Sequence, residues 1–97
     1  MQVNLKSEVQ RYVSQFGDVE LRNIIGTPYY SCNLNKVPTV IFPNVILAKT
    51  KSDIVNFEPF VSELKNSHQI IRLDVIQDHM GNTIEIKPIY LNNYSGL

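Results

Sequence analysis

Residues 72–87, RLDVIQDHMGNTIEIK, consist of two runs of alternating apolar and polar residues on either side of a turn-rich centre. A period of two predicts strands with one buried and one solvated face, and the short connection predicts an antiparallel hairpin. The side chains expected on the buried face are those of Ile71, Leu73, Val75, Ile84, Ile86 and Tyr90.

The charges of this hairpin predict its register. Pairing Val75 with Ile84 would place like charges directly opposite each other, which is unfavourable. Moving the pairing by two residues in one direction sets Asp74 against Lys87, and in the other direction it sets Arg72 against Glu85; both keep the apolar face inward. Of these two registers we expect the first, with Val75 opposite Ile86.

The loop between the two strands would then run from Asp78 to Thr83. Gly81 and Asn82 tolerate the positive φ angles that tight turns require. This turn accounts for the acid, the glycine and the asparagine, and it leaves His79 and Met80 at an exposed tip.

An amphipathic helix is predicted near the N-terminus. Its apolar residues recur at helical spacing and comprise Val9, Tyr12, Val13 and Phe16. Asn4 or Ser7 could accept hydrogen bonds from the first free amides as an N-cap, and Gly17 could take the left-handed turn that ends the helix.

The segment NFEPFVSELKNS, residues 56–67, predicts a second helix. Its apolar stripe comprises Phe57, Phe60, Val61 and Leu64. Pro59 fits this helix only if Asn56 is the N-cap, because a first-turn amide has no partner within the helix.

Three further segments have strand character. Residues 18–26, DVELRNIIG, alternate like a half-buried strand, and residues 27–38 contain a short strand at Tyr29-Tyr30. Residues 39–50 are strand-like on both sides of Pro43. Since proline donates no ladder hydrogen bond, Pro43 marks a tight turn, a bulge or an edge.

These elements predict one α+β domain spanning residues 1–97. We expect an N-terminal helix, an antiparallel sheet of about four to six short strands, a second helix and a C-terminal β-hairpin. Both helices are expected on one face of the sheet, and residues 91–97 are expected to form a flexible tail.

Composition narrows the function. The 97 residues include nine basic and nine acidic side chains, whereas nucleic-acid binders normally carry a basic surplus. The N-terminal residues lack the apolar core of a secretory signal, and the apolar run VIFPNVILA is far shorter than the roughly 20 residues of a membrane span. We therefore expect a cytoplasmic protein (in the host cytoplasm, if viral) that does not associate with membranes.

Catalytic and metal-binding patterns are weak. One cysteine, Cys32, cannot complete a disulfide or a cysteine-based zinc site within one chain. Cys32 could form a nucleophilic pair with His68 or His79, with Asp78 or Asp53 orienting the histidine. A long strand separates the two histidines, so they should not share a metal within one chain; a symmetric site between two subunits is the alternative. We expect no catalytic residue, no metal and no cofactor.

Protein binding remains as the leading hypothesis. Residues 37–50 are apolar for their length, and as a sheet edge they could pair with a partner or a second copy; a central, doubly buried strand is the alternative. The candidate interaction surface comprises Tyr29, Tyr30, Val40, Phe42, Val45, Leu47, His79, Met80 and Tyr94.

We thus expect a non-catalytic module that binds another protein and forms a homodimer. An inhibitor, an immunity protein or an accessory factor, including one from a virus or mobile element, fits this description. The alternatives are a nucleic-acid-binding or transcription-regulatory domain, disfavoured by the zero net charge, and a small Cys/His enzyme.

Overall fold

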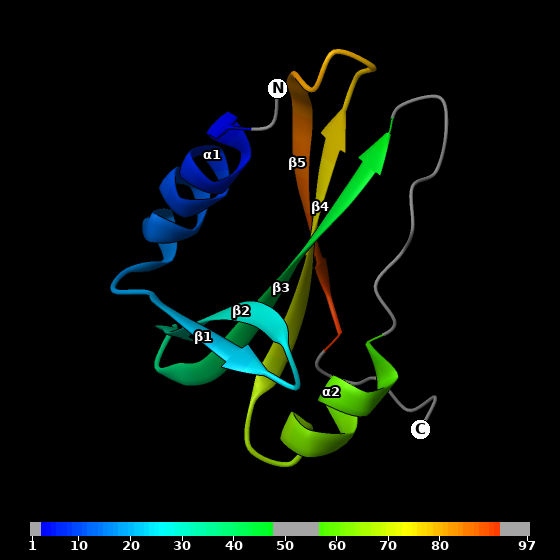
Figure 1. The fold of residues 1–97 in the computed structure, drawn as a ribbon. Coiled ribbons are helices and arrows are strands. Elements are labelled where there is room, and N and C mark those ends of the chain that lie inside the picture. The colour runs from blue at the N-terminus through cyan, green and yellow to red at the C-terminus, as the bar shows by residue number, and fades with distance from the viewer. Residues whose placement is uncertain (1–2, 48–56, 92–97) are drawn as a thin grey trace.

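The computed structural model describes residues 3–47 and 57–91, with side chains from Glu8 onward. The described elements, in chain order, are α1 (Val3–Val13), a 3-10 turn (Ser14–Phe16), β1 (Glu20–Ile24), β2 (Thr27–Leu34), β3 (Val37–Leu47), α2 (Glu58–Leu64), β4 (Gln69–Gln77) and β5 (Thr83–Tyr90). The strands form a five-stranded sheet in the order β1-β2-β3-β4-β5 (Figure 1). The predicted α+β class and element order are confirmed.

The sheet is mostly antiparallel, but β3 and β4 run parallel to each other. Their pairing extends from Thr39 beside Gln69 to Leu47 beside Gln77. A parallel pair needs a crossover connection, and the chain between the two strands contains α2. The prediction of an antiparallel sheet therefore holds for the other strand pairs and is wrong at this one.

The two helices cover opposite faces of the sheet, so the prediction that both lie on one face is also wrong (Figure 1). Val9 and Val13 of α1 pack in a core cluster with Ile41 of β3. Val40 and Phe42 instead pack in the cluster of α2. Because successive strand side chains point to opposite faces, the continuous apolar run of β3 has to be covered on both sides.

The register of the C-terminal hairpin is as predicted, with Val75 opposite Ile86 and Asp74 opposite Lys87. The pairing shifts between Ile76 and Gln77 and passes over Ile84. This bulge leaves Ile84 exposed rather than buried, because an extra residue in a bulge falls out of the alternation.

The last residue of β5 and the one that follows it also differ from expectation. Tyr90, predicted to be buried, is exposed on this edge strand. Leu91, predicted to begin the tail, donates its amide to the Ile70 carbonyl at 2.6 Å and packs against the α2 cluster. Residues 92–97 lie outside the described residues.

The apolar faces predicted for both helices are confirmed. Their predicted N-caps are not: Asn4 and Ser7 lie within α1, and Phe57 precedes α2 with no side-chain capping bond. Asn56, the proposed cap, lies outside the described residues. Pro59 occupies the first turn of α2, as expected.

Candidate binding cleft

A cleft opens where β2 and β3 separate. The two strands are joined by a two-residue turn at Asn35-Lys36, whose φ angles are 53° and 67°. From Leu34 opposite Val37, their pairing extends to Tyr30 opposite Ile41 and, among the described residues, ends there. Beyond this point β2 continues beside β1 and β3 continues beside β4.

Two prolines explain why the pairing stops. Continued by two residues, the register would place Pro28 opposite Pro43. In a hairpin with a two-residue turn, the residues flanking the turn exchange both N–H···O bonds, and every second pair after them does the same. Pro28 and Pro43 would form such a pair, and neither has an N–H to donate. The ladder therefore loses both bonds at this position.

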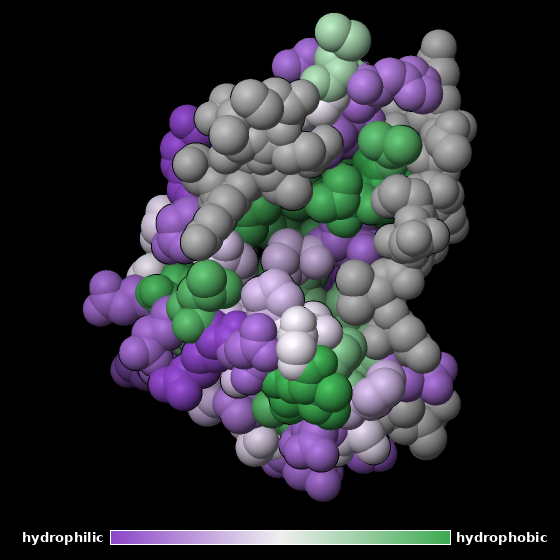
Figure 2. Space-filling model, viewed as in Figure 1, coloured by the Kyte–Doolittle hydropathy of each residue, from purple (hydrophilic) through white to green (hydrophobic). Residues whose placement is uncertain are grey.

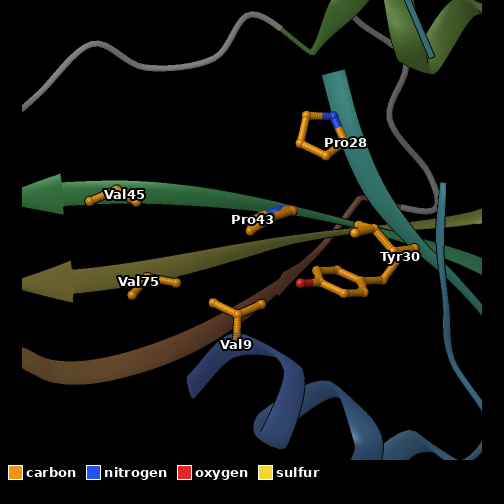
Figure 3. Close-up of a pocket in the computed structure, with 7 residues that line it drawn as sticks. Val9, Pro28, Tyr30, Pro43, Val45 and Val75 are labelled. Carbon is orange, nitrogen blue, oxygen red and sulfur yellow. The ribbon is translucent and has the colours of Figure 1, made fainter. Parts of the chain in front are cut away.

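The resulting cleft has a volume of about 340 Å³. It is lined by one residue from α1, one from β1, and the remainder from β2, β3 and β4: Val9, Leu21, Pro28, Tyr30, Pro43, Val45 and Val75. Figure 3 shows the side chains of Val9, Val45 and Val75 on one side of the space and the rings of Pro28 and Tyr30 on the other. Tyrosine is the only ionisable residue type among them.

Tyr30 supplies the polar atom of the cleft. The residue is only 3% exposed, and its hydroxyl points into the space between Pro43, Val75 and Val9 (Figure 3). Among the described residues no group forms a hydrogen bond with this hydroxyl. Burial raises the pKa of the Tyr30 phenol, so at neutral pH the hydroxyl can both donate and accept.

The cleft opens to the surface at its rim. Leu21 of edge strand β1 is 48% exposed, and Pro28 is exposed as well. Apolar surface gathers in the hollow between α1 and β3, and a second apolar patch covers the tip of the β1–β2 hairpin (Figure 2). Ile25, in the turn at that tip, is 71% exposed.

A polar pair lies on the opposite, α2-facing side of the sheet. Asp74 is buried, and its Oδ2 accepts a hydrogen bond from Arg72 Nη2 at 3.1 Å. Arg72 Nε lies 2.8 Å from Asp74 Oδ1, but its N–H is poorly aimed at that oxygen, so this second contact is an ion pair rather than a hydrogen bond. The pair neutralises a charge that would otherwise be costly to bury.

The residues named from the sequence do not form one surface. Val40 and Phe42 are buried beneath α2 and are removed from the candidate surface, because a partner cannot reach them. Tyr29 is half-buried, with its ring 5.5 Å from that of Phe42. Tyr30 and Val45 line the cleft.

The other candidates lie elsewhere. Leu47 is half-buried at the end of β3, His79 and Met80 are exposed at the hairpin tip, and Tyr94 lies outside the described residues. Residues 37–47 form a central strand in the sheet order, so the edges are β1 and β5.

The hairpin tip is organised by Asp78. One carboxylate oxygen, Oδ1, accepts hydrogen bonds from the amides of Met80 and Asn82, both at 2.9 Å. The Asn82 side-chain amide donates to Oδ2 at 3.2 Å. Hydrogen bonds from Asn82, then from Met80, lower the pKa of Asp78. Both oxygens of the Asp78 carboxylate thus accept hydrogen bonds from the turn. Asp78 therefore stabilises the turn rather than orienting His79 as a base.

The candidate nucleophile and the histidines are separated. Cys32 is buried in the α1 core cluster, and burial raises the pKa of its thiol. His68 precedes β4 and contacts Ser67 Oγ through Nδ1 at 2.9 Å, whereas His79 follows β4. A nine-residue strand holds the two imidazoles roughly 30 Å apart. Asp53 lies outside the described residues, and no group of three or more metal-binding side chains occurs among those that are described.

Sequence reasoning missed five residues of the cleft. These are Val9, Leu21, Pro28, Pro43 and Val75. A usable signal was present, because Pro28 lies seven residues before Asn35 and Pro43 seven residues after Lys36. Prolines placed symmetrically about a two-residue turn predict an interrupted ladder, provided that the turn is recognised first.

Comparison of the chain with family models, curated proteins and solved structures found no match. Over residues 3–47 and 57–91, neither helix has the length and apolar character needed to cross a bilayer.

Proposed function

We propose that this protein is a small non-catalytic module that binds another protein through the cleft between α1 and the diverging strands β2 and β3. The observation that carries this proposal is the apolar lining of a cleft that opens at the exposed residues Leu21 and Pro28. When a partner covers apolar surface that water can reach, the complex is stabilised by roughly 25 cal/mol per Å² of surface buried.

The turn between β1 and β2 supports a protein partner rather than a small molecule. Ile25 adopts φ 49° and is 71% exposed. A β-branched residue at positive φ is strained, and asparagine or glycine would fit this turn better. In the free protein no burial of the Ile25 side chain compensates for this backbone strain. A contact between Ile25 and a partner would supply that burial. A surface that runs from the cleft along β1 to this turn is longer than a small ligand could cover.

The cellular setting remains part of the proposal. We place the protein in the cytoplasm, as an inhibitor, an immunity protein or an accessory factor, because of its single cysteine and the apolar run too short to span a membrane. We also propose a homodimer. Edge strands β1 and β5 each present an exposed apolar side chain, Leu21 and Ile84 respectively, and unpaired sheet edges favour association.

A comparison of two rim substitutions tests the binding proposal. Leu21→Glu places a charge at the mouth of the cleft, and Val37→Glu places the same charge on a residue of similar exposure, 43% against 48%. Each variant and the wild type are immobilised and exposed to extract of the native host. A protein retained by the wild type and by Val37→Glu but lost with Leu21→Glu supports the proposal. Equal retention by all three contradicts it.

The homodimer is tested separately by light scattering. A mass of twice 11.1 kDa supports it. A monomer at concentrations up to about 1 mM, the range of weak association, contradicts it without touching the cleft.

A further inference from the structure

We infer that the cleft receives one uncharged aromatic side chain of the partner, a tryptophan or a tyrosine, whose ring fills the apolar space and whose polar atom hydrogen bonds with the Tyr30 hydroxyl. This inference rests on the proposed function and specifies the anchor that its site takes.

The size of the cleft suits such an anchor. Cavities of about 150 Å³ bind benzene, and this cleft is about 340 Å³, which accommodates a substituted or two-ring system. Aromatic side chains also provide more buried area than any aliphatic one, about 150–250 Å² each. They are therefore the usual anchors of protein interfaces.

The lining selects against charge. Among Val9, Leu21, Val45 and the two prolines there is no group that could neutralise a buried ion, and desolvating an unpaired charge is costly. A lysine, arginine, aspartate or glutamate side chain is therefore excluded from the interior, although its chain could cross the rim.

Tyr30 selects for a polar atom on the ring. Its hydroxyl is aimed into the cleft and has no hydrogen-bond partner among the described residues, although the residue as a whole is only 3% exposed. An entering ring would bury this oxygen, and buried polar groups are almost always hydrogen-bonded. An indole N–H or a phenol O–H satisfies the group, whereas the benzyl ring of phenylalanine leaves it without a partner.

N-acetyl-tryptophanamide is a suitable probe because the protein contains no tryptophan, so its fluorescence can be excited selectively. The site of binding is read from methyl NMR. We expect the methyl resonances of Val9, Val45 and Val75 to shift on titration, and those of Val61, on the α2 side, to stay in place. No binding, or shifts at Val61 instead, would overturn the inference.

Tyr30→Phe tests the hydrogen bond. A neutral hydrogen bond contributes a net 0.5–1.5 kcal/mol, so the dissociation constant of N-acetyl-tryptophanamide should rise about two- to tenfold. N-acetyl-phenylalaninamide has the same apolar character without a polar ring atom. It should bind the wild type more weakly than N-acetyl-tryptophanamide does, and it should bind Tyr30→Phe at least as tightly as the wild type, because the variant has no hydroxyl left to bury without a partner. Equal tryptophanamide affinity for wild type and variant, or equal loss of both ligands, would overturn the inference.

Two further measurements keep the outcomes separable. If Tyr30→Phe alters the methyl spectrum of the free protein, Leu21→Glu replaces it as the variant, and its weaker probe binding is the expected result. If the probes do not bind but partner capture still depends on Leu21, the aromatic anchor is wrong and the proposed function stands. If capture is also indifferent to Leu21→Glu, both are wrong.

Discussion

Replacing Pro28 by threonine and Pro43 by valine in one variant should close the cleft. The two prolines would face each other as a hydrogen-bonded pair if the β2–β3 register continued, and both lack the N–H that such a pair needs. The double variant restores both donors. We expect the ladder to extend from the Tyr30–Ile41 pair to position 28 opposite position 43.

The effect on stability is small because two contributions oppose each other. Two restored hydrogen bonds contribute about 1–3 kcal/mol in total. Removing two prolines loosens the unfolded chain and costs about 0.4–1 kcal/mol each, or about 0.8–2 kcal/mol together. The free energy of unfolding should therefore change by no more than about 1–2 kcal/mol, and the informative readout is local.

Hydrogen exchange at the two new amides provides that readout. An amide held by a hydrogen bond that opens at a local cost of about 1.4 kcal/mol exchanges about tenfold more slowly than a free one. The probe N-acetyl-tryptophanamide should also lose its site. Each single variant retains one proline and should show at most one protected amide.

Pro38→Thr is the matched control. Pro38 lies in β3 opposite Asn33, within the intact ladder, at a pair that does not exchange hydrogen bonds across β2 and β3. Its replacement should leave the cleft and probe binding unchanged. If the amides at positions 28 and 43 exchange freely in the double variant while the fold is retained, the two prolines are not the cause of the separation between β2 and β3.

Three other outcomes follow from the described contacts. Arg72→Met leaves the buried Asp74 carboxylate without its ion-pair partner. Urea unfolding should show that the free energy of unfolding falls by about 2–4 kcal/mol, less than for a fully buried pair because Arg72 is partly exposed. Adding Asp74→Leu should recover most of this stability, and no recovery would contradict the role given to the pair. Hydrogen bonds from Asn82 lower the pKa of Asp78 below its ordinary 3.8, so its contribution to stability is present above that pH and lost as the pH falls through the lowered value; Asp78→Asn should lack this part of the pH dependence in urea titrations between pH 5 and about 2. Ile25→Asn should raise the free energy of unfolding by about 1 kcal/mol, by relieving the strain at φ 49°, while weakening partner capture; a destabilised variant would show that this turn is not strained.

The local elements and one long-range contact set could be predicted from the sequence. The charges of the hairpin left two registers open, one with Asp74 opposite Lys87 and one with Arg72 opposite Glu85, and the structure has the first, which was the expected one. The apolar stripes of α1 and α2 followed from helical spacing. The N-cap predicted for α1 was wrong because the helix begins before Asn4, and sequence alone gives weak information on where a helix starts.

The layering and the site could not be predicted in the same way. Whether a helix covers one face or the other depends on the path of the crossover, which no alternation of residues encodes. The apolar run of residues 39–47 was compatible with an edge or a centre, since a buried strand and an apolar edge have the same composition. Val40 and Phe42 therefore entered the candidate surface, although they lie beneath α2.

By itself, the sequence determined which side chains could share a face, because backbone periodicity is local and the same in every protein. It also contained the two prolines that interrupt the ladder. Only the tertiary structure decided that β3 is central, that the helices lie on opposite faces, and that Val9 and Val75 meet Tyr30 around an open space. These contacts join residues from five different elements, and their free energy depends on packing across the whole sheet rather than on any one segment.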